Sequence, residues 1–124
     1  MIQILKSKIH RATVTAADIN YVGSITIYSE FMDAAGIFEY EKVLVVDVNN
    51  GQRFETYVIK GEDPKNAFQI NGASARLVSI GDRIIVMAFA YIEAENTYQY
   101  KPKIIVMDEG NKLIGAETLR GRKL

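Results

Sequence analysis

The residues best suited to chemistry are the pair Gly23-Ser24 and a few scattered cations and hydroxyls. A serine hydroxyl is a weak nucleophile until a neighbouring base or its local geometry activates it. Ser24 begins an alternating segment, residues 24–28, that is typical of a β-strand. The pair alone is more typical of a turn before a strand, so a reactive Ser24 has to be argued from the rest of the chain.

The composition excludes several kinds of site. The 124 residues include no cysteine and one histidine, His10, which excludes disulfides, thiolate metal sites and multi-histidine metal sites. The usual nucleophilic triad is also disfavoured by this single histidine. The chain has no spaced carboxylate cluster and no glycine-rich phosphate loop. We therefore expect no metal.

The charge balance limits the partners. Acidic and basic residues number 15 each, so no net field attracts nucleic acid or an anionic membrane. The longest apolar run, residues 84–92, is too short to span a membrane, and the N-terminal segment lacks the features of a signal peptide. We expect one soluble, cytoplasmic domain without nucleic-acid or membrane partners.

Taken one by one, the other candidates have ordinary structural explanations. Lys8 and His10 share one face of a strand, where most such pairs are simply exposed. Arg53 follows a hairpin signal and is typical of a solvated charge. Tyr57 suits a strand position with a hydrated hydroxyl. The small-residue turn at 71–75 is more often a matter of backbone geometry than of binding.

Short strands separated by turn signals must position these residues. We expect strands at 2–15 (long or bent), 24–29, 42–48, 53–60, 68–70, 83–92, 103–107 and 111–114. Residues 30–36 predict a helical turn ended by Gly36, Asn50-Gly51 predicts a hairpin, and 71–75 can open another helical turn. This pattern favours a small closed barrel. The run at 84–92 predicts burial on both faces, in the core or at a subunit interface.

Five segments occur together in a specific order: MIQILKSKIHRATVTAADINYVGSITI, DAAGI, NGQRFETYVI, INGASA and GDRIIVM. In this combination the chain resembles the pyruvoyl-dependent aspartate 1-decarboxylases, over about residues 1–116. The resemblance implies a mainly β domain at 1–116, a small six-stranded double-psi β-barrel with short helical turns. It also implies a homotetramer with active sites at subunit boundaries. Residues 117–124 are expected to be a flexible tail.

The resemblance implies that Ser24 attacks its own backbone. Its hydroxyl would add to the Gly23 carbonyl, and the resulting ester would eliminate and hydrolyse to a pyruvoyl group. The inactive proenzyme would become a β chain, 1–23, and an α chain, 24–124. Gly23 has no Cβ, which leaves its carbonyl open and permits strained backbone angles. Thr56 would donate a hydrogen bond to the oxyanion.

The implied reaction converts L-aspartate to β-alanine and CO2 for pantothenate and coenzyme A synthesis. The pyruvoyl group derived from Ser24 would form a Schiff base with the substrate amine and accept the electron pair, in place of pyridoxal phosphate. Tyr57 would return a proton to the α-carbon. No metal and no pyridoxal phosphate are implied.

The substrate's two carboxylates call for cations. Arg53 can grip one bidentately and Lys8 can hold the other, and which cation takes which carboxylate is left open. His10 would orient the substrate or add charge. The remaining residues implied at the site are Thr56, the backbone N–H groups of Gly72, Ala73 and Ser74, Asn71 as a brace, and Tyr21 as a wall.

The chain departs from the family pattern at two positions, and the resemblance also leaves open a partner protein for maturation. Ile25 stands where some relatives have cysteine, and Ser74 stands where alanine is common. Some relatives need a helper protein for cleavage, which leaves a maturation partner open.

Two other functions remain as alternatives. One is a barrel that kept the fold and lost the chemistry, serving in binding or assembly. The other is a small DNA-binding β-protein, which the balanced charge disfavours. The intact set Ser24, Tyr57, Thr56, Arg53 and Lys8 favours the enzyme.

Overall fold

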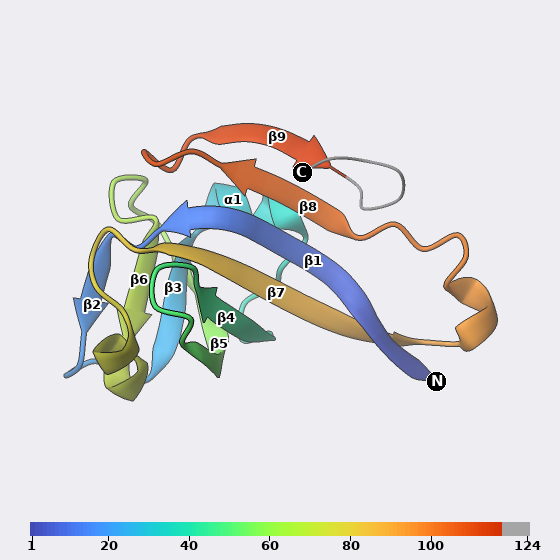
Figure 1. Cartoon of the computed structure of the whole chain (residues 1–124), viewed down its shortest axis with the longest axis horizontal. Helices are drawn as coiled ribbons and strands as arrows, with labels where there is room; N and C mark the ends of the chain where they lie inside the picture. The colour runs from blue at the N-terminus through green and yellow to red at the C-terminus, as the bar shows by residue number, and fades with distance from the viewer. Residues whose placement is uncertain (118–124) are drawn as a thin grey trace.

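A computed structural model describes residues 1–117, which fold into a mainly β protein (Figure 1). The strands follow the order β2-β6-β3-β5-β4-β7-β1-β8-β9. Their bounds are β1 (Ile2–Thr13), β2 (Ala16–Asp18), β3 (Ser24–Tyr28), β4 (Lys42–Asp47), β5 (Arg53–Gly61), β6 (Phe68–Asn71), β7 (Arg83–Ile92), β8 (Lys103–Met107) and β9 (Leu113–Glu117). The helical segments are α1 (Ser29–Ala35) and the 3-10 helices η1 (Gly72–Leu77) and η2 (Ala94–Asn96). The mainly β fold is confirmed. No pairing within residues 1–117 joins the end strands β2 and β9, so the six-stranded barrel stays a prediction.

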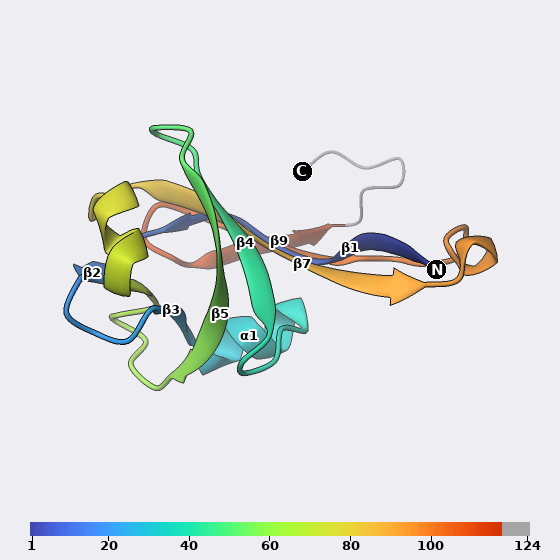
Figure 2. The same cartoon turned by 90° about the horizontal axis from the view of Figure 1, so that it is seen from below.

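Strands β1 and β7 form a long antiparallel arm, with the N-terminus and η2 at its far end (Figures 1 and 2). β1 also pairs in parallel with β8. Two register shifts interrupt the β1–β7 pairing, and Arg11 has φ 63°, so β1 bends as predicted. The chain then runs through Val14 and Thr15, which donate to Asp82 O and Phe68 O, into β2 beside β6. One bent segment therefore pairs with β7 and β8 along its first part and with β6 along its second part.

The core lies on one face of the alternating strands. In β7, Ile84, Val86 and Ala88 are buried, whereas Tyr91 is 66% exposed. The core of the single chain thus covers one face of residues 84–92, and their burial at a subunit interface stays a prediction. Alternation leaves the second face of β7 partly open because nothing in residues 1–117 covers it fully. The largest fully buried side chains include Phe68, Ile9, Ile25, Ile27, Ile70, Ile84, Val43 and Val45.

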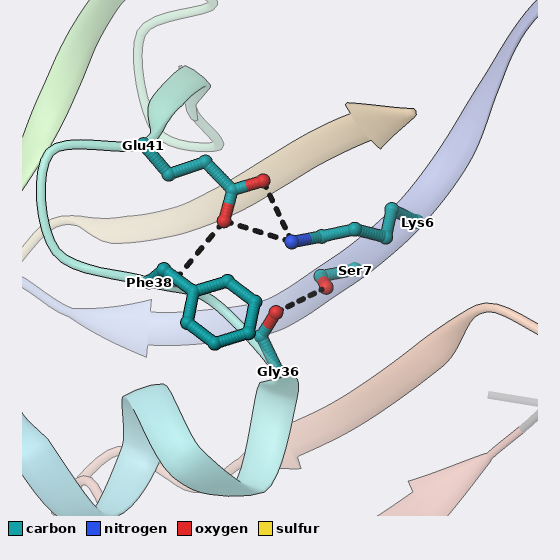
Figure 3. A network of polar contacts seen from close by, with 5 residues as sticks. All are labelled: Lys6, Ser7, Gly36, Phe38 and Glu41. Atoms are coloured by element: carbon teal, nitrogen blue, oxygen red, sulfur yellow. Dashed lines mark hydrogen bonds and ion pairs between the residues drawn. The ribbon is translucent and has the colours of Figure 1, made fainter. Parts of the chain in front are cut away.

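The short helix α1 ends as expected at Gly36, whose φ of 69° is the left-handed cap that glycine adopts without strain. The segment after it is tied to β1 (Figure 3). Lys6 Nζ lies 2.7 Å from Glu41 Oε2 and 5.0 Å from the Phe38 ring centroid, and Phe38 N–H donates to Glu41 Oε1. Ser7 Oγ also donates to Gly36 O. These contacts fix the segment between α1 and β4 against the strand that carries Lys8.

A hairpin joins β4 to β5 and sets the start of β5 at Arg53, which pairs with Val46. The predicted turn at Asn50-Gly51 is confirmed, and Gly51 has φ 76°. Asp47 organises the loop, because its Oδ1 accepts the N–H groups of Asn49 and Asn50. Its Oδ2 is buried without a hydrogen-bond partner among the described residues.

We expect Asp47 to make the stability of the chain pH-dependent. Burial and, next, the nearby Asp82 carboxyl raise the pKa of Asp47 to about 6. Protonated Asp47 therefore stabilises the folded state. This contribution to the free energy of unfolding is lost as the pH rises from about 4 through 6. At pH 8 the Asp47→Asn variant should be the more stable, by on the order of 2 kcal/mol in urea unfolding, because the amide keeps Oδ1 and carries no charge.

The matched control for this prediction is Asp63→Asn. Asp63 accepts the N–H of the residue two positions ahead, as Asp47 does, but it is exposed. Its substitution should leave the pH profile of stability unchanged. An Asp47→Asn profile parallel to the wild-type profile between pH 4.5 and pH 8 would show that Asp47 does not carry the effect.

The other predicted elements are found, with small differences at their ends. β7 and β8 have the predicted bounds, and the last strand runs over 113–117 rather than 111–114. The short elements β2 and η2 were not predicted. The predicted tail, 117–124, lies outside the described residues apart from Glu117, which ends β9. None of the helices in residues 1–117 is long and apolar enough to cross a membrane.

Candidate active site

Ser24 begins β3 and lies directly opposite Asn71, the last residue of the antiparallel strand β6. Both residues are buried, with Ser24 1% exposed and Asn71 fully enclosed. Asn71 Nδ2 donates to Ser24 Oγ at 2.9 Å and to Thr26 Oγ1 at 3.0 Å. The Ser24 hydroxyl donates to Val22 O at 3.2 Å. Its oxygen is therefore held at a defined position at the start of the strand, rather than free in a turn.

The alternation of β3 explains how a serine is buried here. Ile25 and Ile27 point into the core, so Ser24 and Thr26 share the opposite face. Across the strand pair, Thr26 lies opposite Gln69. Gln69 Nε2 donates to Asn71 Oδ1 at 2.8 Å. Sequence reasoning missed Thr26 and Gln69, although the two-residue spacings Ser24/Thr26 and Gln69/Asn71 were a signal for them.

The segment before Ser24 lies against the first residue of η1. A Cβ added to Gly72 would lie 2.6 Å from Gly23 Cα and 3.3 Å from Tyr21 O, so only glycine allows this approach. Gly72 has φ 74°, whereas Gly23 is not among the residues with positive φ. A Cβ at Gly23 would meet nothing within 4 Å, so the close approach requires glycine at Gly72 rather than at Gly23. The strained angles that Gly23 permits stay a prediction. The side chains of Tyr21 and Val22 are 51% and 69% exposed.

Strand β5 carries two further candidates, of which Tyr57 lies beside Ser24. It pairs in parallel with β3, with Val58 opposite Ile25. Tyr57 and Ser24 each stand one position earlier, on the face away from the core. Arg53 shares this face but begins β5, about 13 Å along the strand from Tyr57.

Thr56 alternates with Tyr57 and therefore falls on the same side of β5 as the buried Val58. Within residues 1–117, no hydrogen bond joins the Thr56 side chain to Gly23. Its role as donor to the oxyanion stays a prediction.

Lys8 and His10 are not brought to Ser24 within this chain. They lie on β1, and the strand order places β5, β4 and β7 between β1 and β3. Across residues 1–117, no hydrogen bond or ion pair links either side chain to Ser24 or Asn71. Burial lowers the pKa of His10, and the charges of Lys8, Arg11 and Arg83 lower it further. This shift favours a neutral imidazole, and the role of His10 at the site stays a prediction.

The turn predicted at 71–75 is the start of η1, which runs over Gly72–Leu77. Ala73 is exposed and Ser74 is half-buried. Their binding of substrate through backbone N–H groups stays a prediction. Among residues 1–117, no cluster of three or more histidine, cysteine or acidic side chains could hold a metal.

Comparisons with known proteins give the same family as the sequence motifs. The family model described as aspartate decarboxylase matches residues 1–114. A protein of Caldicellulosiruptor bescii named aspartate 1-decarboxylase is 59% identical over 113 residues, covering 91% of this chain and 88% of that protein. Proteins of the same name from Lactiplantibacillus plantarum and Bacillus cytotoxicus are 53% and 52% identical, covering 91% and 90% of this chain and 87% of each relative. The chain therefore belongs to the aspartate decarboxylase family.

Proposed function

We propose that this chain is a self-activating aspartate 1-decarboxylase that converts L-aspartate to β-alanine and CO2. The observation that carries the proposal is the buried Ser24, whose oxygen is held by Asn71 directly after the exposed residues 21–23. A hydroxyl kept beside its own scissile peptide bond, with no acid–base triad hydrogen-bonded to it among residues 1–117, suits a reaction that each molecule performs once. The names of the relatives support the substrate.

The activation is an acyl shift followed by elimination. Ser24 Oγ adds to the Gly23 carbonyl carbon, the Gly23–Ser24 C–N bond breaks, and the Ser24 nitrogen takes the proton. Loss of the Ser24 α-proton then expels the Gly23 carboxylate and leaves dehydroalanine. Addition of one water and release of one ammonia give a pyruvoyl group. Asn71, which donates to Ser24 Oγ, can stabilise this oxygen as it loses its proton.

The surroundings of Ser24 fit such a group. The position is buried, and the Asn71 NH2, which donates to Ser24 Oγ in the uncut chain, is a hydrogen-bond donor beside the place where the group would form. The pyruvoyl group supplies the electron sink that ordinary side chains lack. Arg53 and Lys8 would bind the two carboxylates, His10 would orient the substrate, and the N–H groups of η1 would complete the pocket. We further propose that the β-alanine enters pantothenate synthesis in the cytoplasm.

The proposed fold is a six-stranded double-psi β-barrel. The strand order runs β6-β3-β5-β4-β7, and the bent segment β1–β2 lies beside β7 with its first part and beside β6 with its second. If this segment is counted as one strand, the sheet has six strands. The two end strands of the order, β6 and β7, then both pair with this segment. This continuity supports closure of the barrel.

The proposed assembly is a homotetramer in which a second copy supplies part of each site. Lys8 and His10 lie on the first part of the bent segment, which pairs with β7 and β8, whereas only its second part lies beside β6, the neighbour of β3. A site formed within one chain would therefore lack them. The open face of β7, with Phe89 and Tyr91 exposed, supports an interface between copies. Sedimentation analysis should give a mass four times that of the chain. A monomeric, active enzyme would contradict a shared site.

We expect Tyr57→Phe to separate activation from turnover. Tyr57, on β5, lies beside Ser24, and its phenol is the proposed proton donor to the α-carbon of the substrate. The variant should still be cut at Gly23–Ser24, while kcat for aspartate falls by about 100-fold with KM little changed. The control is Tyr98→Phe, at a side chain 79% exposed, which should keep wild-type kcat. Wild-type turnover in Tyr57→Phe would remove Tyr57 from this role.

The test of the whole proposal is a denaturing mass spectrum of the purified chain, followed by an aspartate assay. Two fragments divided between Gly23 and Ser24, the larger lighter by one ammonia than a serine-started chain, are expected to accompany release of CO2. A chain that stays uncut after prolonged warming, and after exposure to cell extract that could hold a maturation helper, would favour the barrel without chemistry.

A further inference from the structure

We propose that Gln69 is a positioning residue for cleavage at Ser24. It acts through Asn71, which is the last of three hydrogen-bonded side-chain amides and the one that contacts Ser24. The inference rests on the proposed self-cleavage and deepens it. Gln69 is half-buried on β6, opposite Thr26, and its Nε2 donates to Asn71 rather than to Ser24. Its effect would be to decide which end of the Asn71 carboxamide faces Ser24.

The amides form a series with one direction. Thr15 Oγ1 lies 2.7 Å from Asn66 Oδ1, to which it can donate, and Asn66 Nδ2 donates to Gln69 Oε1 at 2.6 Å. Gln69 Nε2 donates in turn to Asn71 Oδ1 at 2.8 Å, and Asn71 Nδ2 donates to Ser24 Oγ. Each carboxamide thus accepts at its oxygen and donates from its nitrogen.

This direction constrains the end of the series. If the Asn71 carboxamide turned over, its NH2 would meet the NH2 of Gln69, and both would lose a hydrogen bond. Turning Gln69 over as well would set its NH2 against that of Asn66. Turning all three over together avoids these clashes only if Asn66 donates to Thr15 Oγ1 and the Thr15 hydroxyl donates to Phe68 O instead. The orientation of Asn71 is therefore tied to that of Gln69, and neither amide can turn over alone.

The orientation matters to the proposed chemistry. A donor at Ser24 Oγ leaves the serine proton free to leave, and the hydroxyl already directs that proton to Val22 O. The same donor favours the oxygen as it gains charge during attack on Gly23. With the Asn71 oxygen in its place, the hydroxyl would donate to Asn71 and its oxygen would lose this stabilisation.

Gln69→Glu tests the idea without changing the shape of the side chain. Both carboxylate oxygens accept, so the bond from Asn66 can remain, but no donor is left for Asn71 Oδ1. Asn71 would turn its NH2 toward the new carboxylate and away from Ser24. We expect the rate of cleavage, followed by denaturing mass spectrometry, to fall at least tenfold. Gln99→Glu, which adds the same charge at an exposed site, should cleave at the wild-type rate.

A double-mutant cycle separates positioning from mere structural support. If Gln69 acts through Asn71, then Gln69→Glu should slow cleavage less than twofold further in an Asn71→Ala chain. A tenfold effect in that background, or wild-type cleavage by Gln69→Glu alone, would overturn the inference. If the Gln69→Glu variant does not fold, Gln69→Met replaces it in the test, because methionine removes the donor without adding charge. Gln69→Met should slow cleavage and keep a near-normal melting temperature.

The inference and the proposed function fail in different ways. An uncut wild-type chain overturns the self-cleavage proposal and this inference with it. A wild-type chain that is cut, beside a folded Gln69→Glu chain that is cut equally fast, overturns the inference alone.

Discussion

The Ser24→Ala chain is expected to remain uncut and to release no CO2 from aspartate, while folding like the wild type. The substitution removes the only atom proposed to attack Gly23. It should have a small effect on stability, because Asn71 Nδ2 keeps its bond to Thr26 Oγ1. The loss of one hydrogen bond at a buried site costs about 1 kcal/mol. Denaturing mass spectrometry, thermal unfolding and an aspartate assay on one preparation measure all three properties.

The matched control for Ser24→Ala is Ser7→Ala. Ser7 is equally buried, at 1% exposed, and its Oγ donates to Gly36 O rather than to any atom of residues 21–24. This variant should be cut and active like the wild type, so loss of a buried hydroxyl by itself would not account for an uncut chain. Cleavage of Ser24→Ala between residues 23 and 24 would contradict attack by Ser24 Oγ.

The elements that could be predicted have strong local patterns. β7 and β8 are apolar runs between turn signals, and their bounds were predicted correctly. The end of α1 at Gly36 also depends on a local feature, the positive φ of one glycine. In contrast, β2 and η2 have three residues each, and their short sequences carry no distinct period.

The parts of the site that were missed depend on pairing between distant segments. Thr26 and Gln69 meet only because β3 and β6, more than 40 residues apart in sequence, pair in one register. A shift of one residue would turn Gln69 toward the core. The role of Gly72 was likewise hidden, because the turn pattern shows small residues but not which backbone they approach.

The separation of Lys8 and His10 from Ser24 bears on which copy of the chain supplies each site residue. A resemblance places roles on residues without stating which copy supplies them. Here Lys8 and His10 lie on the part of β1 that pairs with β7 and β8, and not on β2, which pairs with β6 beside β3. The proposed shared site accounts for this separation, and it explains why the single chain leaves the aromatic side chains of β7 exposed.

Gly72→Ala should block cleavage almost as completely as loss of the serine, although residue 72 takes no part in the chemistry. An added Cβ would lie 2.6 Å from Gly23 Cα and 2.9 Å from Gly23 N, closer than such atoms can approach. The atoms it meets belong to the backbone, so the cleavage segment itself has to move. A displacement of about 1 Å at a reacting centre can cost about 100-fold in rate. We expect no cut chain in the time in which the wild type is fully cut.

The control has to separate this contact from backbone strain, because alanine is also disfavoured at φ 74° by about 1–2 kcal/mol. Gly51 has nearly the same φ, 76°, and a Cβ there would meet nothing within 4 Å. Gly51→Ala should therefore lose comparable stability and still be cut at the wild-type rate. If both variants are cut equally fast, the approach of Gly72 to Gly23 does not hold the scissile bond in place. If only Gly72→Ala stays uncut, the position of Gly23 against η1 is part of the activation geometry.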